Sequence, residues 1–305
     1  MEWNQNHQNE ADGKQSDSNR ETQLPAERGS GEVQPILKLP DLRTALGAVR
    51  KAAPRVHCIT NSVTSESVAN LLLTAGGSAI MAEAVQEVEE VTAACQATLL
   101  NSGVPSDKKW DSLRGAGSAA NALNHPLILD PVGAAASAYR KAGLAALLAE
   151  VKPTLIRCNQ TEALALLELQ TKAPEQLLSG SVDSALTIEQ GQLRQAAGLL
   201  ARRFSCTVLI TGETDLISDG QRVLTVSGGD RRICRLTGGG CMLSALCALF
   251  AGAGLAAFDA AAVAAGLWKR CAEEAGARTD AAGGGMGTFR SALFDAVDAF
   301  AFQNG

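Results

Sequence analysis

The feature that most constrains the fold is the alternation of short apolar segments with longer amphipathic ones from residue 36 onward. The apolar segments are about five residues long, and they read "RVHCIT", "SAIMA", "ATLLN", "PLILD", "TLIRCN" and "CTVLITG". Helical patterns lie between them, for example near residues 83–94, 106–123 and 137–150. This order is typical of right-handed βαβ units, in which helices cover both faces of a parallel sheet. We therefore predict a three-layer α/β/α fold.

The second half of the chain departs from this alternation. The segment "DLISDGQRVLTVSGG" contains two strand-like runs joined at Asp219-Gly220, which predicts a hairpin and thus an antiparallel edge on the sheet. From Gly239 onward we expect helices near 240–252, 257–275 and 287–302. No internal repeat or linker follows residue 36, so residues 35–305 are predicted to form one domain.

The first 34 residues differ in composition from the rest. They are polar, nearly free of aliphatic side chains, and hold seven acidic and three basic residues. Such a segment cannot repay the entropy of folding, so we predict a disordered acidic tail over residues 1–34. The remaining 25 acidic and 24 basic residues nearly cancel, and only 4% of the chain is aromatic. This balance argues against nucleic-acid binding and favours a small-molecule ligand.

The eight cysteines show no paired spacing of the kind found in zinc sites, and several lie in apolar runs. They are expected to be core thiols in a reducing compartment. The chain also has no uninterrupted apolar stretch of about 20 residues and no apolar signal-peptide core. We therefore expect a soluble cytoplasmic protein without a membrane partner.

Polar side chains gather where the predicted strands end. In parallel α/β sheets the ligand lies beyond the carboxyl ends of the strands. The residues expected at those ends are His57, Asn61, Met81, Asn101, Asp130, Arg157, Asn159, Glu162, Thr211 and Glu213. Acidic groups, a guanidinium and a glycine-rich turn on one edge are suited to a phosphorylated ligand.

Two of these segments allow a structural interpretation as well as a functional one. Asp130 ends the strand "LILD" and is placed to bind Mg²⁺, but it would equally cap the next helix. Asn159 and Glu162 have the spacing of a capping box, which explains them without any ligand. Arg157 is harder to explain by capping, and its position at the end of an apolar strand suits phosphate oxygens.

The segment "LTGGGCMLSAL" is predicted to combine a strand end, three glycines and a helix start. It is not a Walker A loop, since no Lys-Ser/Thr pair follows the glycines. The N–H groups of Gly239, Gly240 and Cys241 would form an anion hole for a transferring phosphoryl group, although a tight strand-to-helix turn explains the glycines too. Cys241 as a thiolate nucleophile is a further alternative, because a helix N-terminus lowers a thiol's pKa. That alternative lacks a histidine base with an obvious pairing.

Seven motifs together resemble the hydroxyethylthiazole kinase family, which has a ribokinase-like fold and acts in thiamine salvage. They occur in the family's order across residues 37–303 and read "VHCITNSVT", "SAIMAEAVQEVEE", "LILDPVGA", "VKPTLIRCNQTE", "ITGETDLISDG", "LTGGGCMLSAL" and "GMGTFRSALFDAV". The resemblance implies transfer of the γ-phosphate of MgATP to the primary alcohol of 4-methyl-5-(2-hydroxyethyl)thiazole. It also implies a homotrimer with sites at subunit interfaces.

The resemblance implies a role for each matching residue. By the matching positions, the substrate-binding residues are Met81 and Gly238, the ATP-binding residues are Arg157, Thr211 and Asn159, and the Mg²⁺ residues are Asp130 and Glu162. From their places at a strand end and at the helix start, we add His57 and Asn61 to the substrate-binding group, and Gly239 and Gly240 with Cys241 as the catalytic group. Related ribokinase-like enzymes usually have an aspartate base where Cys241 stands. The cysteine is then a positioned, proton-accepting group rather than a covalent nucleophile.

The chain departs from the family pattern at Gly239, Cys158 and Ala135. These differences affect the backbone near the expected phosphate site but remove no charged group. Two alternatives therefore stay open: a ribokinase-like kinase of another small vitamin-precursor alcohol, and a non-catalytic nucleotide- or thiazole-binding protein.

Overall fold

A computed structural model describes residues 41–169 and 190–303, so the predicted tail lies outside the described residues. Its centre is an eight-stranded sheet. The strands are β1 (Arg55–Ile59), β2 (Ser78–Ile80), β3 (Ala97–Asn101), β4 (Leu127–Asp130), β5 (Leu155–Asn159), β6 (Thr207–Thr211), β7 (Asp215–Ser218) and β8 (Val223–Val226).

The strand order is β2-β1-β3-β4-β5-β6-β7-β8. Strands β1 to β6 pair in parallel, and β7 and β8 pair antiparallel to form one edge. The predicted parallel sheet with an antiparallel edge is confirmed. In the predicted hairpin, β7 ends at Ser218 and β8 begins at Val223, and the turn between them contains Gly220 at φ 89°.

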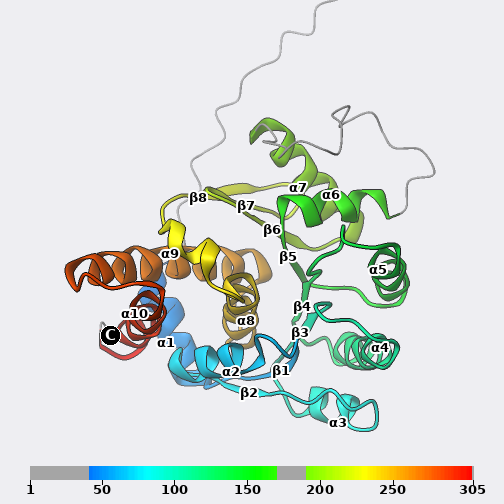
Figure 1. Ribbon diagram of the computed structural model, residues 1–305. Helices are drawn as coiled ribbons and strands as arrows, with labels where there is room; N and C mark the ends of the chain where they lie inside the picture. Colours follow the sequence, from blue (N-terminus) through cyan, green and yellow to red (C-terminus); the bar gives the residue numbers. More distant parts are fainter. Residues whose placement is uncertain (1–40, 170–189, 304–305) are drawn as a thin grey trace, which may run out of the picture. The chain divides into compact units, whose positions relative to one another are not determined.

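Helices cover both faces of the sheet (Figure 1). One face carries α3 (Val88–Ala93), α4 (Asp107–Ala122), α5 (Ala138–Glu150), α6 (Gln160–Glu168) and α7 (Gln190–Phe204). The other carries α1 (Leu42–Ala52), α2 (Ser65–Thr74), α8 (Gly239–Gly252), α9 (Ala257–Ala281) and α10 (Met286–Asp298), which continues as a short π-helix, Ala299–Gln303. The three-layer prediction is therefore confirmed, although α3 is shorter than expected and α9 longer.

The central strands send alternate side chains into two separate cores. Leu99 and Ile128 pack with α8, whereas Leu100 and Leu129 pack with α4 and α5. Successive side chains of a strand point to opposite faces, and here both faces are covered, so nearly every strand position is apolar. We call the two sides the α8 face and the α4 face.

The segment before α8 is different from the prediction. No strand leads into the three glycines; a 3₁₀ helix, Arg231–Arg235, does so instead. It is held by Asp230, whose carboxylate accepts hydrogen bonds from Nε and Nη2 of Arg232 at 2.8 and 2.7 Å. Arg232 also reaches Asp280 near the end of α9. The glycine segment is therefore anchored from α9 rather than from the sheet.

All eight cysteines are free thiols, and only Cys234 is exposed. Seven of them therefore belong to the interior, as predicted.

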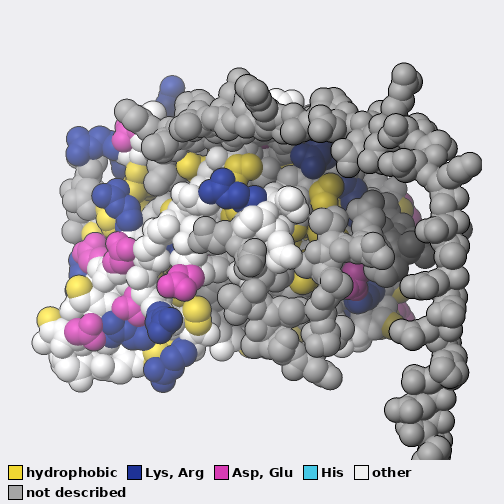
Figure 2. Space-filling view, turned by 90° about the horizontal axis from the view of Figure 1, so that it is seen from above, with side chains coloured by type: hydrophobic (Ala, Val, Ile, Leu, Met, Phe, Trp, Pro, Cys, Tyr) yellow, Lys and Arg dark blue, Asp and Glu magenta, His cyan; other side chains and the backbone are white. Residues whose placement is uncertain are grey.

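Within residues 41–169 and 190–303, none of the helices has the length and apolar character needed to cross a membrane. Figure 2 shows acidic and basic side chains mixed over the visible part of one face.

Candidate active site

Four polar side chains end neighbouring strands on the α8 face. They are Asn101 on β3, Asp130 on β4, Arg157 on β5 and Thr211 on β6. Each lies two residues after a side chain of the α8-face core, namely Leu99, Ile128, Leu155 and Leu209. The period of two thus places all four on one side of the sheet, under the N-terminus of α8.

Asp130 is fully buried in this group. Its Oδ2 accepts hydrogen bonds from Nδ2 of Asn101 and from Oγ of Ser244, both at 2.9 Å. Burial raises the pKa of the carboxyl to about 6, although the nearby Arg157 opposes that shift. Its Oδ1 is buried without a hydrogen-bond partner among the described residues and lies 3.7 Å from Nη1 of Arg157.

Arg157 is held between Asp130, Thr211 and the glycine segment. Its Nη2 donates to Oγ1 of Thr211 at 2.5 Å. A Cβ atom on Gly240 would lie only 2.7 Å from Cζ of Arg157, so only glycine lets the helix start approach the guanidinium. We call Asp130, Arg157 and Thr211 the charged cluster.

The three glycines have different structural requirements. Gly238 is the N-cap of α8 with φ 84°, and a Cβ there would lie 2.6 Å from Cγ2 of Thr64. The N–H of Gly239 already donates to the carbonyl of Leu236 at 3.2 Å. Among the described residues, no hydrogen bond is found for the N–H groups of Gly240 and Cys241. Of the three donors predicted for an anion hole, these two remain available.

Cys241 lies beside two asparagine amides. Its Sγ accepts from Nδ2 of Asn101 at 3.2 Å and from Nδ2 of Asn61 at 3.4 Å. Burial, followed by the charge of Asp130, raises the pKa of the thiol to about 11. The nucleophile alternative required a lowered pKa, so this environment argues against it. We call Cys241, Asn61 and Asn101 the thiol–amide cluster.

Asn159 and Glu162 form the capping box at the start of α6. Oδ1 of Asn159 accepts from the N–H of Glu162, and Oε2 of Glu162 accepts from the N–H of Asn159, both at 2.9 Å. The other carboxylate oxygen of Glu162 accepts from the N–H of Gly133 at 2.9 Å. The structural interpretation of this pair is thus confirmed, and Glu162 additionally ties the loop after β4 to α6.

His57 does not lie where a substrate could use it. It is the middle residue of β1, fully buried, and it lies between Val56 and Cys58, which belong to the α8-face core. Its side chain therefore points to the opposite face, where Nδ1 bonds Oγ1 of Thr92 at 2.8 Å and Nε2 bonds the carbonyl of Ala82 at 3.0 Å. Both ring nitrogens are occupied by these partners, which argues against the substrate-binding prediction for His57.

The remaining predicted positions are dispersed. Met81 follows the edge strand β2 and is 36% exposed. Cys158 is buried in the core of the α4 face, opposite to Arg157, so this departure from the family pattern lies outside the charged cluster. Ala135 is exposed in the turn after β4.

Ser244 and Lys109 belong to the site but were not predicted. Ser244 lies one turn into α8 and donates to Asp130, a role that a serine inside an apolar helix does not announce. Lys109 is 3% exposed, and its Nζ donates to the carbonyls of Thr60 and Gly103 at 2.7 and 2.9 Å. A Lys-Lys pair in a first helical turn usually indicates a solvated surface, so the burial of Lys109 was not predictable from the sequence.

Charged side chains bridge successive loops at the carboxyl end of the sheet. Lys109 joins the loops after β1 and β3, and Arg140 joins those after β3 and β4 through the carbonyls of Ser102 and Val132. Lys269 of α9 joins the β6–β7 loop to the end of β8 through the carbonyls of Gly212, Glu213 and Gly228. The site is therefore built on loops that are cross-linked by side chains.

No group of three or more His, Cys, Asp or Glu side chains suited to a metal ion is found in the described part of the chain. A Mg²⁺ ion that is held mainly by nucleotide phosphates and water needs only one or two protein carboxylates. The buried Oδ1 of Asp130, which lacks a hydrogen-bond partner there, fits that requirement. Both oxygens of Glu162 already accept backbone N–H bonds, so Asp130 fits better.

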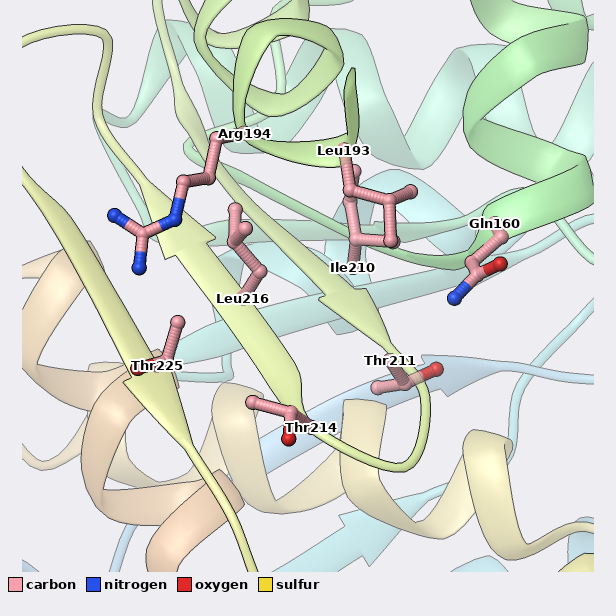
Figure 3. Close-up of a pocket in the computed structure, with 8 residues that line it drawn as sticks. All are labelled: Gln160, Leu193, Arg194, Ile210, Thr211, Thr214, Leu216 and Thr225. Carbon is pink, nitrogen blue, oxygen red and sulfur yellow. The ribbon is translucent and has the colours of Figure 1, made fainter. Parts of the chain in front are cut away.

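A pocket lies between α7 and the strands β6, β7 and β8. Figure 3 shows Leu193 and Arg194 above it, with Thr211 at the end of β6 and Thr214 of the β6–β7 turn below. Its apolar lining residues Ile210 and Leu216 belong to the core of the α4 face. The pocket therefore meets the charged cluster only at Thr211.

The sequence matches the model of the hydroxyethylthiazole kinase family over residues 46–303. The chain belongs to this family. It is 40% identical over 254 residues to a hydroxyethylthiazole kinase of Clostridium botulinum, covering 83% of this chain and 89% of that protein. The solved structure of a hydroxyethylthiazole kinase protein from Pyrococcus horikoshii superposes with a TM-score of 0.72 at 30% identity, covering 84% of this chain and 92% of that one.

The fold extends beyond the family. A ribokinase-like superfamily protein from Enterococcus faecalis matches with a TM-score of 0.55 at 12% identity, covering 87% of this chain and 92% of that protein. This similarity concerns the fold alone. The ribokinase-like architecture and the kinase family are thus established, and the chain is a phosphotransferase that acts on an alcohol.

Proposed function

We propose that this protein transfers the γ-phosphate of ATP to the primary alcohol of 4-methyl-5-(2-hydroxyethyl)thiazole. The observation that carries the proposal is the charged cluster under the N-terminus of α8, in a chain that belongs to the hydroxyethylthiazole kinase family. In the reaction, the alcohol oxygen bonds to the γ-phosphorus, the bond to the ADP oxygen breaks, and the alcohol loses its proton.

The charged cluster is suited to the phosphate groups. Arg157 is oriented by Thr211 and by the close approach of Gly240. Its guanidinium is therefore already in one rotamer before phosphate oxygens bind to it. The free N–H groups of Gly240 and Cys241 at the start of α8 add donors where negative charge gathers on the transferring group. Asn159, at the N-cap of α6, belongs to the same proposed ATP-binding group.

Asp130 is our proposed ligand for Mg²⁺, with Glu162 beside it. The ion supplies charge neutralisation at the phosphate oxygens when it is bound. Asn101 and Ser244 hold Asp130 in place through Oδ2 and leave Oδ1 free. Glu162 keeps the turn at Gly133 in register with α6.

The thiol–amide cluster is proposed to receive the acceptor alcohol, together with Met81 and Gly238. With a pKa of about 11, Cys241 is a neutral thiol at physiological pH, and its neighbours are neutral amides. Phosphoryl transfer has a loose transition state, in which the attacking oxygen needs positioning more than a strong base. The raised pKa argues against the predicted proton-accepting role: Cys241 positions the alcohol as a neutral thiol, and the alcohol's proton passes late to an oxygen of the transferred phosphoryl group. A cytoplasmic location and a homotrimer belong to the same proposal.

The test is a coupled ADP-release assay with MgATP and three acceptors: the thiazole alcohol, a hydroxymethylpyrimidine and pyridoxal. We expect turnover with the thiazole alcohol and at least a tenfold lower kcat/KM with the others, because a neutral site gives no partner for a charged or phenolic ring substituent. Turnover of another acceptor alone would contradict the substrate. Tight ATP binding without turnover of any acceptor would instead support the non-catalytic alternative.

A further inference from the structure

Lys109 is a buried cation that the stability of its own helix does not require. It is the third residue of α4, where the positive end of the helix dipole disfavours a cation. Burial lowers the pKa of its ammonium group, and the nearest carboxylate, Glu83, is 4.0 Å away and half exposed. A desolvated charge without a close ion pair costs stability, which calls for an explanation at this position.

The two carbonyls that bind Lys109 lie next to the thiol–amide cluster. Thr60 precedes Asn61, and Gly103 is two residues beyond Asn101. The loop of Gly103 is packed against both asparagines, since its N–H donates to Oδ1 of Asn101 at 2.9 Å and a Cβ there would lie 3.0 Å from Cβ of Asn61. Lys109 thus fixes the separation of the two loops whose amides meet at Cys241.

We infer that Lys109 is a positioning residue for the acceptor alcohol: by holding the carbonyls of Thr60 and Gly103 it sets the places of Asn61 and Asn101, and through them of the Cys241 thiol. This inference rests on the proposed function for its link to the alcohol. Its structural part, the control of Cys241 by Lys109, holds for whatever acceptor the site receives.

Lys269 provides a matched comparison within the same chain. It is also a buried lysine that donates to backbone carbonyls, with Asp215 3.4 Å from its Nζ. The carbonyls that it binds belong to Gly212 and Glu213, which follow Thr211, and to Gly228, which precedes the segment leading to α8. Lys269 therefore acts on the charged cluster, and general destabilisation caused by losing a buried lysine is common to both variants.

The experiment compares Lys109→Met with Lys269→Met. For Lys109→Met we expect KM for the thiazole alcohol to rise about tenfold, with KM for ATP within about twofold of wild type, since small displacements of positioning groups have effects of this order. For Lys269→Met we expect the larger rise in KM for ATP. Equal changes of both KM values in Lys109→Met would overturn the inference.

A second measurement does not depend on turnover. The rate at which methyl methanethiosulfonate converts Cys241 to its methyl disulfide, with release of methanesulfinate, is followed by peptide mass spectrometry, with the fully buried Cys247 on the same helix as the internal control. We expect Lys109→Met to raise the rate at Cys241 at least fivefold over that at Cys247, and Lys269→Met to leave this ratio unchanged. An unchanged ratio in Lys109→Met overturns the inference, whereas a wild type without thiazole turnover contradicts only the proposed function.

Discussion

The two halves of the site solve the problem of burial in opposite ways. The charged cluster places a carboxylate and a guanidinium side by side under α8. The thiol–amide cluster contains only neutral groups, and the positive charge of Lys109 lies behind it on backbone carbonyls. Charge therefore faces the ligand only where phosphate is expected. At the acceptor end, charge is used to hold backbone instead.

Removing the charge of Asp130 should have the largest effect. Asp130→Asn keeps an oxygen for Asn101 and Ser244 but removes the carboxylate that we assign to Mg²⁺, so kcat/KM should fall roughly 10²–10³-fold. Because the variant leaves the buried Arg157 guanidinium without its carboxylate partner, Tm should fall by several degrees in calorimetry, with the variant still folded at the assay temperature. A Tm drop that accounts for the lost activity would contradict this role.

The pH profile of the wild type is the control for that variant. Since burial raises the pKa of Asp130 to about 6, the carboxylate is present above that pH and is lost as pH falls through it. The kcat/KM for ATP in the free enzyme should therefore decline below pH about 6, and Asp130→Asn should lack this decline. The same acidic limb in both proteins would assign it to another group.

The variants Gly240→Ala and Gly239→Ala should have an effect of intermediate size on activity. Their difference distinguishes displacement of Arg157 from a general change in the glycine segment. A Cβ on Gly240 displaces the Arg157 guanidinium, while a Cβ on Gly239 meets only the Ile233 carbonyl at 3.2 Å. We expect kcat/KM for ATP to fall roughly 10–100-fold in the first variant and by less than about threefold in the second. Equal losses of kcat/KM in steady-state assays would show that the effect comes from the glycine segment itself and not from displacement of Arg157.

His57→Gln should have the smallest effect on activity. The substitution removes one of two buried hydrogen bonds, so the free energy of unfolding should decrease by about 1–3 kcal/mol, measured by urea titration. KM for the thiazole alcohol should stay within about twofold, because the ring lies on the α4 face. A tenfold rise in that KM at unchanged stability would restore His57 to the substrate-binding group.

The sequence predicted the order and type of most elements because strand length, helix periodicity and glycine positions are local signals. It also indicated that Asp130, Arg157 and Thr211 end strands at one edge of the sheet. It could not say to which face each side chain points, because a strand covered on both sides is apolar at every position and shows no alternation. His57 was placed among the strand-end residues for this reason, whereas its ring points to the α4 face.

Contacts between distant segments were not predictable from local patterns. The segment "RRICRLT" has no signal for a 3₁₀ helix until Asp280, 48 residues away from Arg232, provides a partner. Lys109 and Ser244 likewise acquire their roles only through the carbonyls of two strand-end loops and the carboxylate of Asp130 on β4. The glycine segment was recognised as a helix start, but its different demands at positions 238, 239 and 240 come from Thr64, Ile233 and Arg157.

The side-chain bridges between successive strand-end loops have a consequence for the thermodynamics of ligand binding. A loop whose carbonyls are already fixed by Lys109, Arg140 or Lys269 has little backbone freedom left to lose when a ligand arrives. The guanidinium of Arg157, confined by Thr211 and Gly240, is similarly close to a single rotamer before phosphate is present. Most of the entropic cost of ordering this site is thus met during folding, so that the binding energy of each substrate remains available for holding it in a reactive arrangement.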